Sequence, residues 1–302
     1  MLNLYQFRIF RYVRKLFLLF AIIFFSSCGH AGIDSGNKII TVSIAPFKYF
    51  VKEIAGNEYK INIMVPAGSN PHIYEPYPRQ IFELNQSVGY VSNGYLGFEI
   101  TWLDRFYDLN KTMKKMSLGR NIEPLGSGHH HEGDHVEGAD PHYWVSPKCA
   151  LIMAISVRDF MCELNPGNKN RYEANYQVLA SRIQKLDREA SVLFSGVQSR
   201  SFMIFHPNLG YLARDYGLEE ISVEYEGKEP PPSRMKELID RARADRIKTI
   251  FVQREYDIKN ATAIAHEIGA KVQIIDPLSE NWLDSTTDII NALYSSLSES
   301  SK

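Results

Sequence analysis

The sequence predicts an α/β protein made of two lobes, each with a mainly parallel sheet of four strands, joined by a long helix. Two observations predict this fold. Short segments rich in β-branched residues alternate with helical segments in two separate stretches of the 302-residue chain. Alternation of strand and helix is typical of a parallel sheet. Between the two stretches lies a region, 147–197, that lacks a strand pattern.

The first stretch begins with KIITVSIA at 38–45, a β-branched run that predicts a strand. Apolar and polar residues alternate at 59–65, which predicts a second strand. The other expected elements of this lobe are strands at 87–91 and 115–122 and helices at 47–54, 79–85 and 98–110.

The second stretch repeats this order after residue 200. Its expected elements are strands at 201–205, 219–223, 248–252 and 271–275, and helices at 209–216, 232–244 and 260–268. Because strand and helix alternate in the same way in both stretches, we expect two Rossmann-like lobes.

The middle region predicts two helices. Ser146 and Pro147 favour a helix start, with Ser as the N-cap and Pro at the first position. The segment Asn165-Pro166-Gly167 ends this helix, and apolar residues then recur at helical spacing over 170–194. That second run spans about 37 Å at 1.5 Å per residue. We interpret it as a helix connecting the lobes, because strands resume only after it; a plain core helix is the alternative.

The N-terminus has the layout of a secretory signal peptide. Basic residues precede an apolar run at 16–25, which is short for a membrane span, and small residues follow. Ser26 and Ser27 before Cys28 resemble a bacterial lipobox, although Phe25 stands where the usual pattern has Leu. We therefore expect a signal peptide at 1–27, lipidation of Cys28 and a membrane-anchored tether at 28–37. An ordinary cleaved signal with an incidental cysteine is the alternative.

These segments set the expected domain boundaries and location. The N-terminal lobe is expected at 38–168, the linking helix at 169–197 and the C-terminal lobe at 198–302. The exported protein is expected on the membrane surface, periplasmic or cell-surface, and as a monomer.

The overall composition excludes several classes of protein. Lys and Arg total 34 against 35 for Asp and Glu, and nucleic-acid binders usually carry a basic excess. Three cysteines are too few for a disulfide scaffold. Cys149 and Cys162 lie 13 positions apart in the first middle helix, which places them roughly 20 Å apart, beyond disulfide reach. The apolar fraction of 44% is that of a globular protein with a core.

Three histidines and one aspartate occupy similar places beside prolines in strand ends or loops: His72, His142, His206 and Asp276. Ligands of open α/β sheets bind at the carboxyl ends of strands, so the four side chains converge if the two sheets face each other. Imidazole and carboxylate ligands suit tetrahedral Zn²⁺, whereas Mn²⁺ prefers more oxygen ligands. Each residue alone has a plainer interpretation, as a structural histidine or a turn-forming Asp-Pro.

Five motifs of the sequence resemble those of a known family. The motifs NPHIYEPYP, DPHYWVSP, FHPNLGYLARDYGL, EGKEPPP and VQIIDPL occur in the order found in the zinc and manganese substrate-binding proteins of bacterial ABC importers. The resemblance covers about 39–294. It implies two lobes joined by a long rigid helix, with the metal bound between them by His72, His142, His206 and Asp276. It also implies delivery to a membrane permease with its ATPase.

The resemblance favours the zinc branch. A histidine at position 206 is similar to the zinc members, whereas manganese members typically carry Glu there. Binding of Mn²⁺ or Fe²⁺ by the same class of importer is the alternative. Asn70 and Gln80 stand where the family usually has Asp, which puts hydrogen bonds around the ligands in doubt. Glu255 is an alternative carboxylate ligand.

Residues around the ligands have expected supporting roles. Asp140 and Glu75 are candidates for hydrogen bonds to the unbound ring nitrogens. A closed shell of four ligands leaves no position for an activated water, which argues against an enzyme. A secreted metal-dependent enzyme, with Asp276 as its base, remains an alternative, and a surface adhesin or structural lipoprotein is a further one.

A low-complexity insert, GSGHHHEGDHVEG at 126–138, contains four of the nine histidines: His129, His130, His131 and His135. Glycine and charged residues dominate the rest, so we expect a mobile loop that does not pack. One hypothesis is that this loop collects Zn²⁺ and passes it to the main site. The other is a solvated loop without effect on transport.

Overall fold

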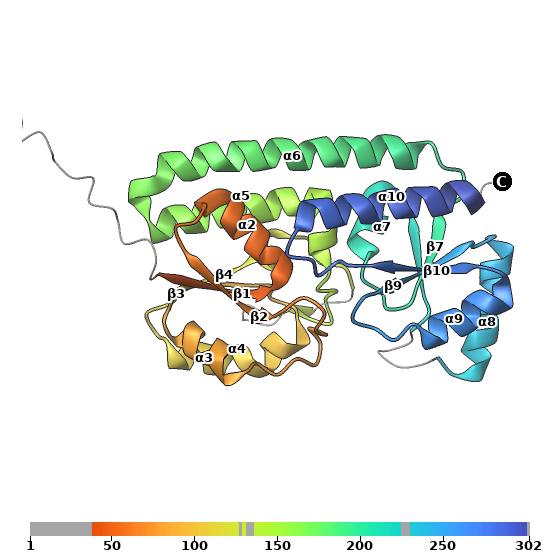
Figure 1. Ribbon diagram of the computed structural model, residues 1–302, viewed down its shortest axis with the longest axis horizontal. Helices are drawn as coiled ribbons and strands as arrows, with labels where there is room; N and C mark the ends of the chain where they lie inside the picture. The colour runs from red at the N-terminus through yellow and green to blue at the C-terminus, as the bar shows by residue number, and fades with distance from the viewer. Residues whose placement is uncertain (1–37, 127–128, 131–135, 225–229, 301–302) are drawn as a thin grey trace, which may run out of the picture. The chain divides into compact units, whose positions relative to one another are not determined.

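The computed structural model describes residues 38–126, 129–130, 136–224 and 230–300. Its described part contains two parallel sheets of four strands each, which confirms the predicted fold class (Figure 1). The N-terminal sheet has the order β2-β1-β3-β4 and the C-terminal sheet the order β10-β9-β7-β8. The N-terminal strands are β1 (Ile39–Ile44), β2 (Lys60–Val65), β3 (Ser87–Ser92) and β4 (Lys114–Ser117). The C-terminal strands are β7 (Ser201–Ile204), β8 (Glu219–Ser222), β9 (Thr249–Gln253) and β10 (Lys271–Ile275).

Helices cover both faces of the N-terminal sheet (Figure 1). On one face lie α3 (Pro78–Asn85) and α4 (Gly97–Leu109), and on the other α2 (Ala45–Ala55) and α5 (Pro147–Leu164). The C-terminal helices are α7 (Gly210–Tyr216), α8 (Pro232–Ala244) and α9 (Lys259–Ile268). Apart from β4, the bounds of these strands and helices match the expected elements to within two residues.

The middle region folds as predicted. The Ser146 hydroxyl accepts hydrogen bonds from the N–H groups of Lys148 and Cys149, at 3.2 and 3.4 Å, and so caps α5. The long helix α6 (Lys169–Ser195) has 27 residues and runs past both sheets (Figure 1). Its buried side chains recur at helical spacing, from Tyr172 to Phe194. Cys149 and Cys162 are free, as their separation predicts.

The predicted fourth strand at 115–122 is wrong in its second half. The strand β4 ends at Ser117, and a short 3₁₀ helix, η1 (Leu118–Asn121), follows. Here Gly119 donates to the carbonyl of Asn93 at 3.1 Å, and a Cβ at this position would lie 2.8 Å from the same oxygen. A side chain at this position would clash with the Asn93 carbonyl oxygen, so only glycine fits.

One long helix, α10 (Trp282–Ser300), is absent from the expected elements. Its buried residues Trp282, Ile289, Leu293 and Leu297 lie at helical spacing, so the pattern was available in the sequence. Many serines and threonines between them mask that pattern. The helix contacts α6 and lies beside it in Figure 1.

The larger of two clusters of buried apolar residues continues across the lobes. It includes Phe50 of α2, Tyr172 of α6, Tyr211 of α7 and Trp282 of α10. A second cluster, which includes Met203, lies within the C-terminal lobe. The larger cluster is therefore a core that the two sheets share.

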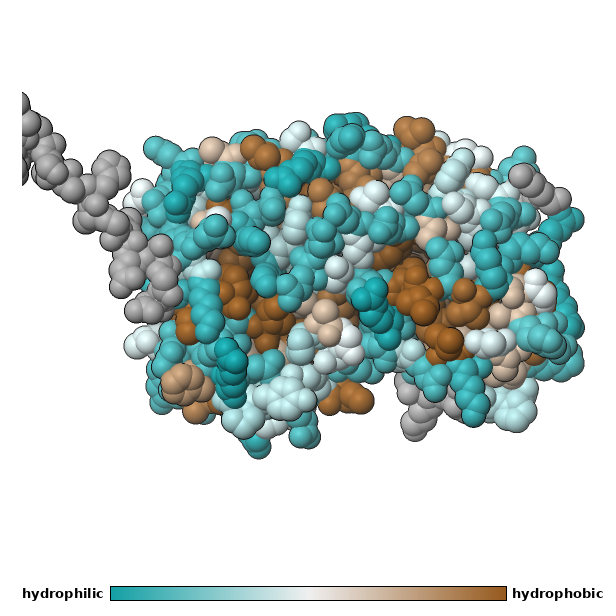
Figure 2. Space-filling model, in the orientation of Figure 1, coloured by the Kyte–Doolittle hydropathy of each residue, from teal (hydrophilic) through white to brown (hydrophobic). Residues whose placement is uncertain are grey.

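The surface in Figure 2 is mostly hydrophilic, with apolar areas between the polar ones.

Several predictions fall wholly or partly outside the described residues. The signal peptide, Cys28 and the tether lie in 1–37, and most of the histidine-rich insert lies in 127–128 and 131–135. Within the insert, β5 (His129–His130) pairs antiparallel with β6 (Val136–Glu137). In the part of the chain that the structure describes, no helix is long and apolar enough to cross a membrane.

Candidate metal site

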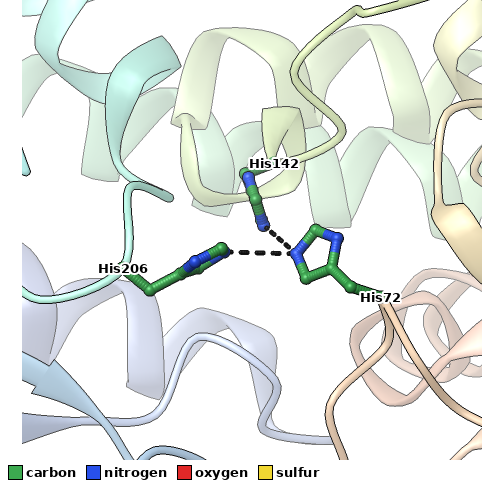
Figure 3. A group of neighbouring side chains, drawn as sticks. All are labelled: His72, His142 and His206. Carbon is green, nitrogen blue, oxygen red and sulfur yellow. Dashed lines mark hydrogen bonds between the residues drawn. The ribbon is translucent and has the colours of Figure 1, made fainter. Parts of the chain in front are cut away.

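Three of the four predicted ligands meet at one point. The ligand atoms of His72, His142 and His206 all lie within 4.8 Å of one another. The Nε2 atom of His72 is 3.2 Å from Nε2 of His142 and 3.2 Å from Nε2 of His206 (Figure 3). The sequence brings them together from the loop after β2, the segment before the 3₁₀ helix η2 (Tyr143–Val145) and the end of β7.

Asp140 fixes the ring of His142. Its Oδ1 accepts the Nδ1–H of His142 at 2.7 Å and the backbone N–H of the same residue at 2.8 Å. Burial raises the pKa of Asp140, but the charge and hydrogen bonds of His142 outweigh burial and lower it. An ionised Asp140 keeps the proton on Nδ1, so the Nε2 lone pair of His142 points at the other two rings. The hydrogen bond is the one expected of Asp140, and its role in metal binding stays a prediction.

Glu224 has the same relation to His206, and the sequence analysis missed it. Its Oε2 accepts a hydrogen bond from Nδ1 of His206. Tyr256 stacks on the other side of this imidazole, with ring centroids 4.8 Å apart and planes 17° apart. Glu224 comes from the end of β8, beside β7 in the sheet. The contact therefore depends on strand register, which the local motif around His206 does not contain.

Burial keeps the imidazoles of His72 and His206 neutral. The pKa of His72 is lowered to about 3 by burial and by the nearby His142 and His206. Burial also lowers the pKa of His206, against the opposite effect of Glu224. At neutral pH both rings therefore retain a lone pair, as metal binding requires.

Glu255 and Asp276 are the two predicted carboxylate ligands, and neither belongs to the three-histidine group found in the described residues. Glu255 lines the same cavity as the three rings, a space of about 10 Å³ that holds about one ion or water. Asp276 falls outside the three-histidine group, and its Oδ2 lies 3.2 Å from Nη1 of Arg254. Glu255 Oε2 and Asp276 Oδ1 are buried and have no hydrogen-bond partner among the described residues. Burial and the nearby Asp276 raise the pKa of Glu255 to about 7.

The remaining residues predicted to take part in metal binding are Glu75 and the four histidines of the insert. Glu75 is exposed, and it is not among the described hydrogen-bond partners of the three site histidines. His129 and His130 lie in β5, and His131 and His135 lie outside the described residues.

The two positions that depart from the family pattern both make hydrogen bonds. The side chain of Asn70 accepts the backbone N–H of His72 at 2.9 Å and donates to the Tyr256 hydroxyl at 3.4 Å. Gln80 donates to the carbonyl groups of Ile63 and Met64 at 2.7 and 2.9 Å. Amide side chains therefore make the hydrogen bonds at both positions. Asn70 precedes His72 in the chain and Gln80 follows it, so the loop that carries His72 is bonded on both sides of the histidine.

Comparison with known proteins adds independent findings. A model of the family described as zinc-uptake complex component A, periplasmic (ZnuA) matches residues 40–297. The zinc-binding lipoprotein AdcA of Streptococcus pneumoniae is 26% identical over 280 residues, which cover 88% of this chain and 56% of that protein. The chain thus spans about half the length of the curated relatives it matches.

Solved structures agree with the family model. A crystal structure of ZnuA superposes with a TM-score of 0.79 at 34% identity, over 86% of this chain and 98% of that one. A ZnuA deletion mutant with zinc bound gives the same TM-score at 35% identity and the same coverage. Because the family model covers most of the chain and the fold and histidine motifs agree with it, the protein belongs to the ZnuA family of periplasmic zinc-uptake components.

Proposed function

We propose that the protein is the extracytoplasmic binding component of a metal ABC importer, and that it binds Zn²⁺ through His72, His142 and His206. The observation that carries this proposal is the convergence of three Nε2 atoms on one point, two of them on rings oriented by carboxylates. Membership of the ZnuA family supports the same substrate.

Zinc fits this donor set best. Three imidazoles and one carboxylate form the tetrahedral nitrogen and oxygen shell that Zn²⁺ adopts, whereas Mn²⁺ takes more oxygen ligands. Asp276 is the proposed fourth ligand, and Glu255, which lines the cavity, is the alternative. A shell closed by a carboxylate leaves no site for activated water, so the proposed role is carriage and not hydrolysis.

A protein of the proposed class delivers its bound metal to a membrane importer. The partners are a membrane permease and its ATPase, and lipidated Cys28 holds the protein to the membrane on the periplasmic or outer side. The zinc-binding lipoprotein name of the AdcA relative supports such an anchor. Because the ligands come from both lobes, metal stabilises the arrangement in which the lobes are correctly apposed, and release requires a local disturbance of that geometry.

Calorimetric titration of the full chain tests the proposal. The protein, purified in detergent and stripped with chelator, is titrated with Zn²⁺ and with Mn²⁺. We expect one tight zinc site, weaker manganese binding, and a loss of zinc affinity of about 100-fold or more in His206→Ala, because one of four ligands is gone. His266→Ala, which removes an exposed histidine of α9, is the matched control.

The other outcomes discriminate between the alternatives. Manganese binding equal to or tighter than zinc would assign the protein to manganese transport. Absence of a tight site for either metal would show the proposed function to be wrong. Retained zinc with turnover of a substrate that is lost in Asp276→Ala would identify an enzyme.

A further inference from the structure

The only acidic residue in the first turn of α4 is a fully buried carboxylate. Glu99 has an exposed fraction of 0%. Its Oε1 accepts the backbone N–H of Asn93 at 2.7 Å and its Oε2 accepts that of Gly94 at 2.6 Å. The hydroxyl of Ser43 donates to the same carboxylate. Burying a carboxyl group is costly unless it is hydrogen-bonded, and these donors satisfy both of its oxygens.

The segment that Glu99 holds, 93–97, is attached to the loop of His142. The side-chain amide of Asn93 donates to the carbonyl of Pro141 at 3.0 Å. The backbone carbonyl of Asn93 accepts the hydroxyl of Tyr143 at 2.7 Å. Pro141 and Tyr143 are the two chain neighbours of His142, so Asn93 bonds to the residues on both sides of this histidine.

The same segment also contacts the backbone of His72. A Cβ placed on Gly97 would lie 2.9 Å from the carbonyl oxygen of His72. Such a contact is too short for any residue but glycine, so the start of α4 is packed directly against the His72 backbone. Glu99, two residues further along the helix, fixes the direction from which that start approaches.

We infer that Glu99 is a positioning residue for metal binding: its buried carboxylate holds the segment 93–97 so that His72 and His142 present Nε2 to His206. This inference rests on the proposed function. Ligand atoms of a metal site must be held to within about 0.5 Å, and residues outside the ligand shell supply that precision. Glu99 is not among the residues that line the cavity of the three histidines, and its hydrogen bonds to Asn93 and Gly94 go to backbone N–H groups.

Glu99→Gln tests the inference on the full chain. The variant keeps the side-chain shape but replaces one acceptor oxygen with an –NH₂ group, which faces the backbone N–H of Asn93 or Gly94. We expect zinc affinity, measured by chelator competition, to fall by about 10- to 100-fold, the range for residues that orient metal ligands. Leu103→Ala, on the same helix and also buried, is the control. It should lower the melting temperature and leave zinc affinity within about twofold.

Two further measurements separate positioning from general loss of stability. The visible spectrum of bound Co²⁺ reports ligand geometry, and we expect it to change in Glu99→Gln but not in Leu103→Ala. Asn93→Ala should lower zinc affinity in the same way. Because Glu99 acts through Asn93, the double variant should lose less affinity than the sum of the two single losses. If Glu99→Gln does not fold, Asn93→Ala and its cobalt spectrum decide the question.

The outcomes are distinguishable from a failure of the proposed function. Wild-type zinc binding with an unchanged affinity and cobalt spectrum in Glu99→Gln overturns the inference alone. Equal losses in Glu99→Gln and Leu103→Ala also overturn it, because the effect is then one of stability. A wild-type protein without a tight zinc site overturns both.

Discussion

The indole N–H of Trp282 donates to the backbone carbonyl of Trp144 at 2.7 Å, and the indole N–H of Trp144 donates to the carbonyl of Pro277 at 2.8 Å. Both rings are 1% exposed. Trp144 lies two residues after His142, and Pro277 directly follows Asp276. This pair of buried hydrogen bonds therefore joins the segments that carry a proposed ligand of each lobe.

This connection predicts that zinc binding produces little change in overall dimensions. The lobes share one apolar core through α6 and α10, and opening them would expose that core and the two indole N–H groups. Burial of apolar surface contributes about 25 cal/mol per Å², so large hinge opening is costly. We expect solution X-ray scattering to give the same radius of gyration with and without Zn²⁺. A large contraction on binding would contradict this prediction.

The sequence named the three histidines as candidates because each lies in a short motif beside a proline, and the structure brings them together; their metal binding stays a prediction. It did not predict Glu224, because the bond to His206 depends on the pairing of β7 with β8. No local pattern encodes the contact of Asp276 with Arg254, because the two residues lie on neighbouring segments of the C-terminal lobe. The two sheets and α6 followed from periodicity, whereas the spacing in α10 was hidden by its polar residues.

Asp140 and Glu224, the carboxylates that orient the imidazole rings, should contribute unequally to zinc affinity. Asp140→Asn and Glu224→Gln keep the side-chain shape but remove the charge that holds the proton on Nδ1. We expect each to weaken zinc binding by about 10- to 100-fold in a chelator competition assay. The effect should be larger for Asp140, because it also accepts the backbone N–H of His142. Glu237→Gln, on the exposed face of α8, is the control. Unchanged affinity in both variants would show that the rings are held without these charges.

Two isosteric variants identify the fourth ligand. We expect Asp276→Asn to lower zinc affinity by about 10-fold or more and Glu255→Gln to lower it less, since a neutral amide is a poor zinc ligand. Asp276 Oδ1 and Glu255 Oε2 are both buried without a hydrogen-bond partner among the described residues, so each is a candidate ligand atom. The reverse order of losses would make Glu255 the ligand and leave Asp276 paired with Arg254. Asp288→Asn, an exposed residue of α10, controls for the loss of negative charge.

Deletion of 127–138 tests the hypothesis of metal capture by the histidine-rich insert. The base of the insert is closed by a hydrogen bond from Asp140 N–H to the Leu125 carbonyl at 2.8 Å, so the deletion need not disturb the main site. We expect unchanged zinc affinity in the purified protein but slower uptake by cells under zinc limitation. Replacement of the four histidines by serine, which keeps the length, should have the same effect. Normal uptake in both variants would favour a solvated loop.

Glu58 provides a prediction about pH and stability. Its carboxylate, in a side chain that is 8% exposed, accepts hydrogen bonds from Tyr172 at 2.7 Å and Asn165 at 2.6 Å and pairs with Arg171. Burial alone would raise its pKa, but these contacts outweigh burial and lower the pKa below 4.5. The unfolded chain therefore takes up a proton first as the pH falls. The stabilisation is complete above about pH 4.5 and is lost as the pH falls from there through the lower folded pKa.

Glu58→Gln should consequently destabilise the protein by about 2 kcal/mol at neutral pH, the size expected for buried hydrogen bonds to a charged group. The difference from wild type should shrink below about pH 4. Urea unfolding followed by circular dichroism at several pH values measures both. Glu53→Gln is a matched control, because Glu53 of α2 also forms an ion pair with α6, through Arg182 at 2.6 Å, but one that is more exposed. Such pairs contribute about 0 to 1 kcal/mol. A loss in Glu58→Gln that is equally large in acid would show that the charge of Glu58 does not stabilise the turn between α5 and α6.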